Sequence, residues 1–413
     1  MTFLGRLFEQ RSTIENPAVP LSSHAILESL GINHHNHTGV IVTEKTALRF
    51  GAVWRAVNLI SALGGALPLH AYRSGTFERR SVRILDNPHP DLTDVEFWRL
   101  QYAHRCLWGN SYSLKLRNQV GQIRELHPLV PSRVKVCNVG STDANPSGKV
   151  FIVDGNLDDP LTPADIFHIP GFGYDGVCGV SPIRLAATAI GLGLAAEEYG
   201  ARLWSAGSML GGVLQTEQRL DQATADRLKA SWRSKVAGLS KAHEVAILDA
   251  GAKFQPITMP NNDAQFIESR DFQVSEVSRW FGVPPFLLNQ TEKSTSWGTG
   301  LEQQATGFVK FDLHPLWLKP TEARITKELT GEGIYAKYKL EGLLRGDTAA
   351  RAEFYNTMRN VGAFSANDIR ELEDLPPVEG GDTYLEPLNM APLGAPRDPN
   401  ATGGTADAPN NAA

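Results

Sequence analysis

The chain has 413 residues, of which 42% are hydrophobic and 21% are charged, and its net charge is -5. This length suggests roughly two or three domains, with enough apolar material for a globular core. A mildly acidic chain is not expected to grip nucleic acid tightly, because phosphate contacts come from lysine and arginine. Three scattered cysteines exclude a disulfide framework and a zinc site, so we expect Cys106, Cys137 and Cys178 to be buried apolar side chains in a reducing compartment.

The two ends of the chain differ in composition from its middle. Residues 1–44 are polar and mixed in composition, which predicts a flexible N-terminal arm. They lack the apolar run that a signal peptide would need. Residues 392–413 are rich in Ala, Asn, Gly and Pro, so they are predicted to be a disordered tail. An uncharged and largely apolar stretch, residues 185–196, is too short for a bilayer, which needs about 20 residues. We therefore expect an intracellular protein without a membrane segment.

The first half of the chain alternates helical and extended patterns. Apolar residues at helical spacing predict helices over residues 53–67 and 94–107, ended by Pro68 and Gly109. Short alternating runs predict strands at residues 69–72, 111–117, 122–126, 134–137 and 150–153. These patterns indicate an α+β region that is built on short antiparallel strands.

The second half is more helical. Ser181 before Pro182 is a helix start signal and predicts a helix over residues 182–206. Other patterns predict helices at residues 220–236, 263–281, 347–361 and 365–372, a strand at 211–215, and a hairpin from 245–248 and 253–257. A polar loop, residues 289–300, precedes a long helix over 301–329, in which proline predicts a kink near His314.

Several motifs match known sites without the required structural context. Gly191-Leu-Gly193-Leu-Ala-Ala196 fits a loose dinucleotide fingerprint, but its glycines lie inside a predicted helix, so close helix packing is favoured. Gly171-Phe-Gly173-Tyr-Asp175-Gly176 holds one carboxylate and is interpreted as a turn that shapes an interface, not a metal loop. His34, His35 and His37 could bind a metal, but an exposed arm is favoured because no suitably spaced Cys or carboxylate accompanies them.

The sequence contains no P-loop, no nucleophile elbow and no zinc-protease motif. We therefore expect no catalytic activity, no cofactor and no metal site. A nucleotide-binding enzyme would need Gly191 at a turn from a strand into a helix.

Several short segments occur in a characteristic order along the chain. They are Val53-Trp-Arg-Ala-Val-Asn58, Trp108-Gly-Asn-Ser-Tyr112, Asp165-Ile-Phe-His-Ile-Pro-Gly171 with Gly179-Val-Ser-Pro-Ile183, Trp280-Phe-Gly-Val-Pro-Pro-Phe-Leu-Leu288, Gly300-Leu-Glu-Gln-Gln304, and Gly362-Ala-Phe-Ser-Ala-Asn-Asp-Ile-Arg370 with Leu375-Pro-Pro and Gly380-Gly-Asp382. Together, over residues 45–390, they resemble the HK97-type family of phage portal proteins. The chain departs from this likeness at a variable-looking insertion, residues 139–148, and at Pro320 in the long helix.

This resemblance implies an α+β portal fold that assembles as a ring. Its parts would be a wing, a stem of two helices, a clip, a tunnel loop and a helical crown. By analogy, residues 45–180 and 301–339 form the wing, 181–206 and 261–285 the two stem helices, 207–260 the clip, 286–300 the tunnel loop, and 340–391 the crown.

The resemblance also implies a function, that of the portal protein of a tailed bacteriophage. Twelve copies would form a ring at one capsid vertex, through which double-stranded DNA is packaged and ejected. Expected partners are the terminase large subunit, the major capsid protein or scaffold, and a head-completion adaptor protein. The ring would assemble in the host cytoplasm and reside in the virion. The alternative is a head-tail adaptor or connector ring protein, which would lack the two-helix stem and the kinked helix.

Charge selects candidate residues within these implied parts, although an ordinary solvated surface is the alternative for each. In the tunnel loop the candidates for DNA contact are Gln290, Glu292, Lys293, Ser294 and Trp297. On the second stem helix, a mildly acidic wall would repel phosphates through Glu268, Asp271 and Glu276. In the clip, a basic surface that suits an acidic partner such as terminase is expected from Arg227, Lys229, Arg233 and Lys235.

Overall fold

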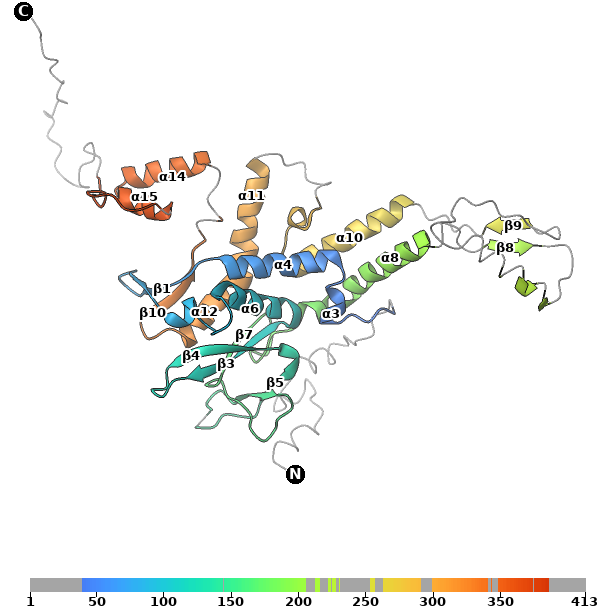
Figure 1. Ribbon diagram of the computed structural model, residues 1–413, viewed down its shortest axis with the longest axis horizontal. Helices are drawn as coiled ribbons and strands as arrows, with labels where there is room; N and C mark the ends of the chain where they lie inside the picture. Colours follow the sequence, from blue (N-terminus) through green and yellow to red (C-terminus); the bar gives the residue numbers. More distant parts are fainter. Residues whose placement is uncertain are drawn as a thin grey trace, which may run out of the picture. The chain divides into compact units, whose positions relative to one another are not determined.

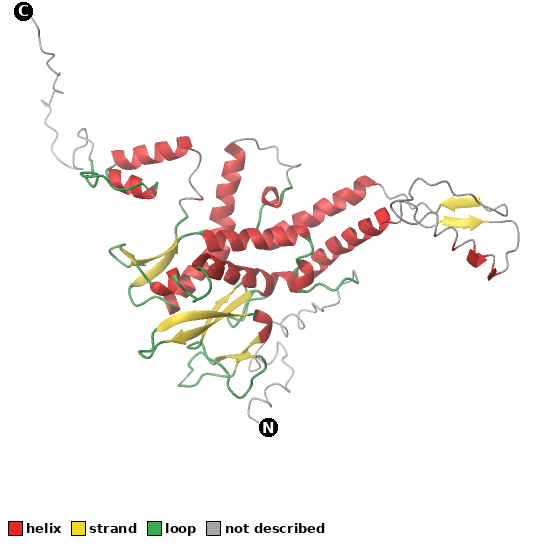
Figure 2. Cartoon of the chain, viewed as in Figure 1, coloured by secondary structure: helices red, strands yellow, loops and turns green. Residues whose placement is uncertain are grey.

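The computed structural model describes residues 39–143, 145–205, 212–215, 222–223, 225–227, 230, 253–256, 263–290, 299–340, 343, 348–373 and 375–385. The chain divides into two compact units, Met1–Leu340 and Glu341–Ala413 (Figure 1). Helices and antiparallel strands are both present in the described residues, so the predicted α+β class is confirmed (Figure 2).

Two helices of the first unit, α4 (Gly51–Ala66) and α6 (Asp94–Trp108), pack closely against each other. Both were predicted from apolar spacing. Gly64 of α4 faces the ring of Tyr102, and an ideal Cβ at this glycine would lie 2.3 Å from a ring carbon. A side chain at position 64 would therefore separate the two helices.

Capping residues mark both ends of α6, and the sequence predicted the one at its end, Gly109. Thr93 forms a capping box with Glu96 at the start of α6, and Gly109 ends α6 with a φ of 74°. Ser181 accepts a hydrogen bond from the backbone of Arg184, with proline at the first position of the short helix α7 (Pro182–Leu185). Three further short helical segments are α3 (Glu44–Ala47), α5 (Arg83–Asp86) and the 3-10 turn Pro131–Arg133.

Four small antiparallel sheets account for the described strands. Their strands are β10 (Ile334–Tyr338), β1 (Leu69–Arg73) and β2 (Arg79–Arg80) in the first; β4 (Ile123–Leu129), β3 (Asn110–Arg117) and β7 (Ile166–Pro170) in the second; β5 (Val134–Asn138) with β6 (Lys149–Val153); and β8 (Gly212–Gln215) with β9 (Lys253–Pro256). The predicted hairpin partner of β9, residues 245–248, lies outside the described residues, and β9 pairs with β8. Alternation of polar and apolar residues did not predict β7. Four of its five residues are buried, so successive side chains do not alternate between the core and solvent.

Helices α8 (Ala187–Ser205) and α10 (Asp263–Phe281) lie side by side (Figure 1). The single helix predicted over 182–206 is divided at Ala186, whose ψ of 7° is not helical. Gly193 lies inside α8, where an ideal Cβ would be 2.8 Å from the ring of Phe50. This confirms the packing interpretation of the glycine motif, because the glycine admits an aromatic ring and not a phosphate.

The long helix near the C-terminal end of the first unit changes its geometry at its prolines. It comprises α11 (Thr299–Phe308), a π-helical segment (Val309–Leu318) and α12 (Lys319–Glu328). The backbone N–H of Lys319 donates to the carbonyl oxygen of His314, five residues earlier, which is the π-helical spacing. The sequence predicted a kink near His314; the structure has a π-helical segment of ten residues there, with Pro315 inside it.

The second unit contains a helical pair, α14 (Thr348–Asn360) and α15 (Ala366–Leu372), as predicted. Ser365 begins α15 with a capping box that includes Asp368. Glu373 receives hydrogen bonds from Arg351 and from the hydroxyl of Tyr355, which ties the end of α15 to α14.

Candidate functional site

The beginning of the predicted tunnel loop is attached to α10. The side-chain amide of Gln290 donates to the carbonyl oxygen of Asp271 at 2.9 Å, and its Oε1 accepts from the hydroxyl of Ser275 at 3.2 Å. A 3-10 turn, Pro285–Leu288, lies between α10 and this residue, and its Leu288 is buried. The other four candidates of the loop, Glu292, Lys293, Ser294 and Trp297, lie outside the described residues.

The three acidic candidates of the stem lie on one broad face of α10. Glu268 is exposed, whereas Asp271 and Glu276 are half-buried. Opposite them, Val277 and Phe281 are buried in the main apolar core of the first unit. Helix α10 therefore presents its acidic residues away from the core.

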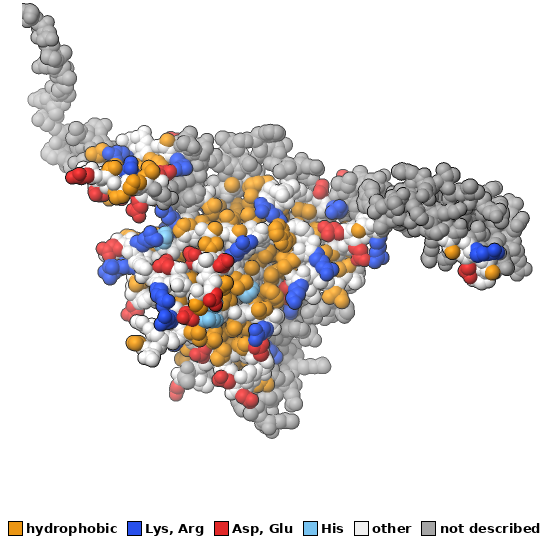
Figure 3. Space-filling model, viewed as in Figure 1, with side chains coloured by type: hydrophobic (Ala, Val, Ile, Leu, Met, Phe, Trp, Pro, Cys, Tyr) orange, Lys and Arg blue, Asp and Glu red, His pale blue; other side chains and the backbone are white. Residues whose placement is uncertain are grey.

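Cations balance part of this acidic face. Arg279 of α10 pairs with Glu276, and Arg270 of α10 lies 3.9 Å from Glu197 of α8. Figure 3 shows both signs of charge along α8 and α10. The described surface of the helix pair is thus mixed in charge, with Glu268 and Asp271 left as the acidic excess predicted from the sequence.

The basic candidates of the clip are only partly described. Arg227 is exposed in a helical turn, residues 225–227. Lys229, Arg233 and Lys235 lie outside the described residues, so the basic surface of the clip stays a prediction.

A buried arginine that the sequence did not single out connects α6 to the long helix. Arg105 is 2% exposed, and its guanidinium donates to the carbonyl oxygens of Trp317 at 2.7 Å and Leu316 at 3.2 Å. Because Pro320 has no N–H, the Leu316 carbonyl lacks the donor that an α-helix would supply four residues later. Arg105 supplies that donor, and burial lowers the pKa of its guanidinium. The side chain also donates to the hydroxyl of Thr321.

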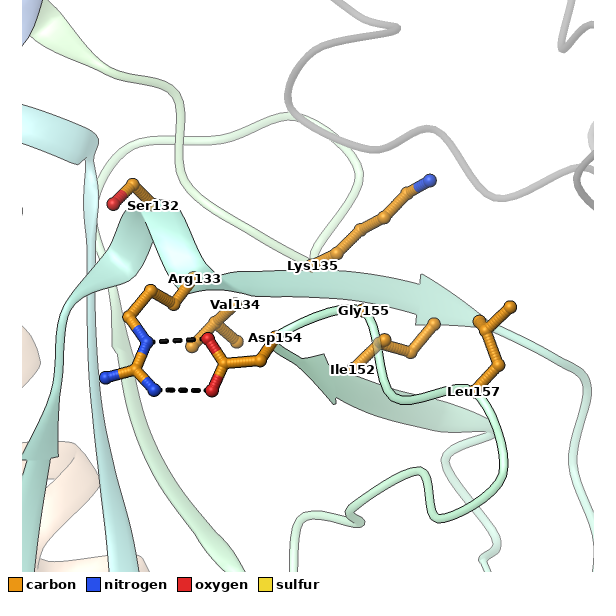
Figure 4. Close-up of a pocket in the computed structure, with 8 residues that line it drawn as sticks. All are labelled: Ser132, Arg133, Val134, Lys135, Ile152, Asp154, Gly155 and Leu157. Atoms are coloured by element: carbon orange, nitrogen blue, oxygen red, sulfur yellow. Dashed lines mark hydrogen bonds and ion pairs between the residues drawn. The ribbon is translucent and has the colours of Figure 1, made fainter.

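A surface hollow of about 720 Å³ lies beside β5 and β6 (Figure 4). Arg133 points at Asp154 across its rim, and two hydrogen bonds of 2.6 and 2.5 Å join them. These hydrogen bonds raise the pKa of Arg133 and lower the pKa of Asp154, so both groups are charged and balance each other. The residues that line the hollow include no nucleophile beside a base, so its chemistry does not suggest catalysis.

Within the described ranges, no group of three or more His, Cys, Asp or Glu side chains is arranged to hold a metal ion. No helix in those ranges combines the length and apolar character that a membrane span requires. The histidines at positions 34, 35 and 37 lie outside the described residues. All three cysteine side chains are buried, as the sequence predicts.

The sequence pattern of one protein family, described as "Phage portal protein", matches residues 51–374. The chain belongs to the phage portal protein family. Its relatives include the portal protein of Enterobacteria phage HK97, which is 32% identical over 93% of this chain and 91% of that protein. A probable portal protein of Streptomyces phage phiC31 is 34% identical over 88% of this chain and 83% of that protein. Proteins of this family are structural components of phage assembly.

Solved structures support the fold. A crystal structure of an HK97 family phage portal protein from Corynebacterium diphtheriae has a TM-score of 0.57 at 17% identity, with 73% of this chain and 96% of that chain covered. A chain in the neck of a native gene transfer agent particle, determined with C12 symmetry, has a TM-score of 0.55 at 23% identity and covers 81% of this chain and 94% of that chain. The portal fold predicted from the sequence is therefore confirmed.

Proposed function

We propose that twelve copies of this chain form the portal ring of a tailed bacteriophage, at one vertex of the capsid. The observation that carries the proposal is the family match over residues 51–374, together with a full-length portal relative at 32% identity. A related chain in a C12-symmetric neck supports the copy number, because closed rings of one protein place identical surfaces around an axis.

In this ring, α8 and α10 form the channel wall. Each helix is buried near the body of the first unit, at Ile190 on α8 and at Phe281 on α10, and is more exposed beyond it. The acidic excess at Glu268 and Asp271 discourages DNA phosphates from sticking during passage. The chain that follows Gln290 would approach DNA through Glu292, Lys293, Ser294 and Trp297.

The remaining assignments concern partners and location. Residues 207–260 would form the clip, where a basic surface docks the terminase large subunit and later a head-completion adaptor, through Arg227, Lys229, Arg233 and Lys235. The ring would contact the major capsid protein or scaffold, assemble in the host cytoplasm and remain in the virion. It would be no enzyme and bind no cofactor, since ATP hydrolysis would belong to the partner motor.

A head-tail adaptor or connector ring is the second candidate. Such a protein would lack a two-helix stem and a long proline-widened helix. The pairing of α8 with α10, and the continuous helical run from Thr299 to Glu328, favour the portal assignment.

The test is genome packaging by a phage that lacks this gene. We expect heads without packaged DNA, and filled heads when the intact chain is supplied in trans. Filled heads in its absence would contradict the portal function. In the same assay, charge reversal at Arg233 and Lys235 should reduce packaging and terminase binding together, whereas normal packaging by this variant would remove the docking assignment alone.

Lys293→Ala tests the loop assignment in that assay. We expect reduced packaging or poorer genome retention, because one cation per copy would be lost from a ring that DNA passes through. Normal packaging and retention would show that Lys293 is dispensable.

A further inference from the structure

A loop between β7 and α7, residues 171–179, presents two large aromatic side chains to solvent. We call it the aromatic loop. Phe172 is 75% exposed and Tyr174 is 54% exposed, and their ring centroids are 5.9 Å apart in an edge-to-face arrangement. Single exposed apolar residues are common on protein surfaces, but a paired aromatic projection is a typical feature of an interaction site.

Close backbone packing fixes the two ends of the aromatic loop. The N–H of Gly171 donates to the carbonyl oxygen of Gly109 at 2.7 Å. An ideal Cβ would lie 2.2 Å from that same oxygen if built on Gly179, and 2.9 Å from it if built on Gly171. The N–H of Val180 also donates to the carbonyl oxygen of Phe172 at 2.7 Å, which closes the loop. Only glycine permits this approach, so the loop is held in one path.

Three polar side chains also hold the backbone of the aromatic loop in place. Asn110 makes two hydrogen bonds of 2.7 Å with the backbone of Gly179, as donor and as acceptor. Oδ1 of Asp175 accepts from the backbone N–H groups of Val177 and Cys178 at 2.8 and 3.1 Å. Nζ of Lys149 donates to the carbonyl oxygen of Val177. The chain thus fixes the loop without burying either aromatic ring.

We propose that the aromatic loop is a contact between neighbouring copies of this chain, in which Phe172 and Tyr174 pack on an apolar surface of the next copy. The proposal rests on the proposed function. A cyclic ring needs heterologous contacts, in which a projection of one copy meets a different surface of the next. Rigid aromatic side chains on a fixed backbone lose little conformational entropy when they bind, which favours them as anchors.

The position of the loop selects a second copy as the occupant. The loop ends two residues before Ser181 caps α7, which leads directly into α8. If α8 lines a channel, the loop lies at the root of the channel wall, where copies crowd toward the axis. The two exposed side chains of the loop, Phe172 and Tyr174, carry no charge, and its one acidic residue, Asp175, accepts hydrogen bonds from the loop's own backbone, so the projecting part suits an apolar surface.

The test is ring assembly of the full-length double variant Phe172→Ser with Tyr174→Ser. We expect the concentration at which half of the protein is in rings to rise by roughly 30-fold or more, as for two hot-spot residues. Native mass spectrometry over a dilution series measures it. The thermal unfolding of the dissociated chain should not change, because both rings are exposed. Phe77→Ser is the matched control, since Phe77 is 71% exposed and lies in a different turn, between β1 and β2.

Unchanged assembly of the double variant would overturn the proposal and leave the portal function standing. Failure of the unaltered chain to form any ring would instead contradict the proposed function. A photo-crosslinking phenylalanine in place of Tyr174 provides the second measurement. Purified rings should yield a covalent product of twice the chain mass on illumination. No such product, or crosslinks only to another head or tail protein in assembled particles, would reject a second copy as the occupant.

Discussion

Helices α4 and α8 are similar in length but differ in how the chain surrounds them. Eight residues of the 16 in α4 are buried, and they are distributed from Ala52 to Gly65. In α8, burial is concentrated near its start, and beyond Gly193 the only described buried residue is Gly200. The first unit therefore packs its core along the whole of α4. It packs only against the start of α8, and the remainder of α8 lies beside α10 alone. A ring of identical copies would supply the environment that one copy lacks.

The largest effect that this comparison predicts is at Arg105, which joins the core of α6 to the long helix. Arg105→Ala should lower the free energy of unfolding of the first unit by roughly 3–5 kcal/mol, because it leaves a cavity and removes the hydrogen bonds to the carbonyl oxygens of Leu316 and Trp317. Chemical denaturation measures this change. Arg99→Ala is the control: Arg99 is exposed on the same helix and donates one hydrogen bond to Asn58, so its loss should cost about 1 kcal/mol or less. A loss below about 1 kcal/mol at Arg105 would show that the connection is not important for stability.

The second prediction compares two glycines that share a left-handed backbone. Gly109 has a φ of 74°, and its Cβ would lie 2.2 Å from the carbonyl oxygen of Val180, whereas Gly121 has a φ of 82° and open space. Gly109→Ala should cost roughly 3 kcal/mol, because overpacking adds to the backbone strain. Gly121→Ala should cost only the strain, about 1–2 kcal/mol. Equal melting temperatures of the two variants would mean that the backbone around Gly109 yields easily.

Acid should destabilise the protein through His168 of β7. His168 is buried, and its Nδ1 accepts from Lys149 while Nε2 faces Asn110. Burial, then the charges of Lys149, Arg324 and Arg105, hold the pKa of His168 well below its usual value. The unfolded chain therefore binds more protons than the folded chain below about pH 6.5, so this stability is present above pH 6.5 and is lost as the pH falls.

The size of this acid effect can be checked with one substitution. From pH 6.5 to pH 5, His168 should cost roughly 2 kcal/mol of stability, at about 1.4 kcal/mol per pH unit. His168→Gln keeps a donor toward Asn110 and an acceptor toward Lys149 but cannot titrate, so its stability should fall less over that range. Burial also lowers the pKa of His104 to about 4, so some acid sensitivity should persist in the variant. Identical slopes for the variant and the unaltered chain would contradict the assignment.

The smallest predicted effect belongs to the helix pair. Arg270 of α10 and Glu197 of α8 are 3.9 Å apart, and the Arg270 side chain is exposed whereas that of Glu197 is half-buried. Arg270→Ala should change the stability of the dissociated chain by about 0–1 kcal/mol, because solvent screens such pairs. Thermal unfolding of the dissociated chain measures this. A loss of several kcal/mol would mean that α8 and α10 stabilise each other within one copy. It would contradict the view that α8, unlike α4, lacks part of its packing environment in a single copy.

Local signals in the sequence predicted much of this fold. Helices α4 and α6 follow their apolar spacing, Gly109 ends α6, and Ser181 caps the start of α7, as the sequence predicted. Residue alternation could not predict β7, since a strand that is buried on both faces does not alternate apolar with polar residues.

The positions of Arg105 and Gln290 depend on contacts between residues that are far apart in the sequence. Arg105 lies 212 residues from Trp317, so a helical pattern alone could not identify its partner. A charged residue next to Cys106 on a buried helix face was the available signal. The attachment of Gln290 to α10 likewise joins residues 15 and 19 positions apart, across the 3-10 turn that precedes the polar loop predicted from the sequence.

The ring is the central claim, and the mass and symmetry of the purified protein test it most directly. Native mass spectrometry should find twelve copies of the 45.1 kDa chain, about 540 kDa in total, and end-on particle averages should show a central hole that is wide enough for duplex DNA. A compact monomer or dimer at every concentration would contradict the account.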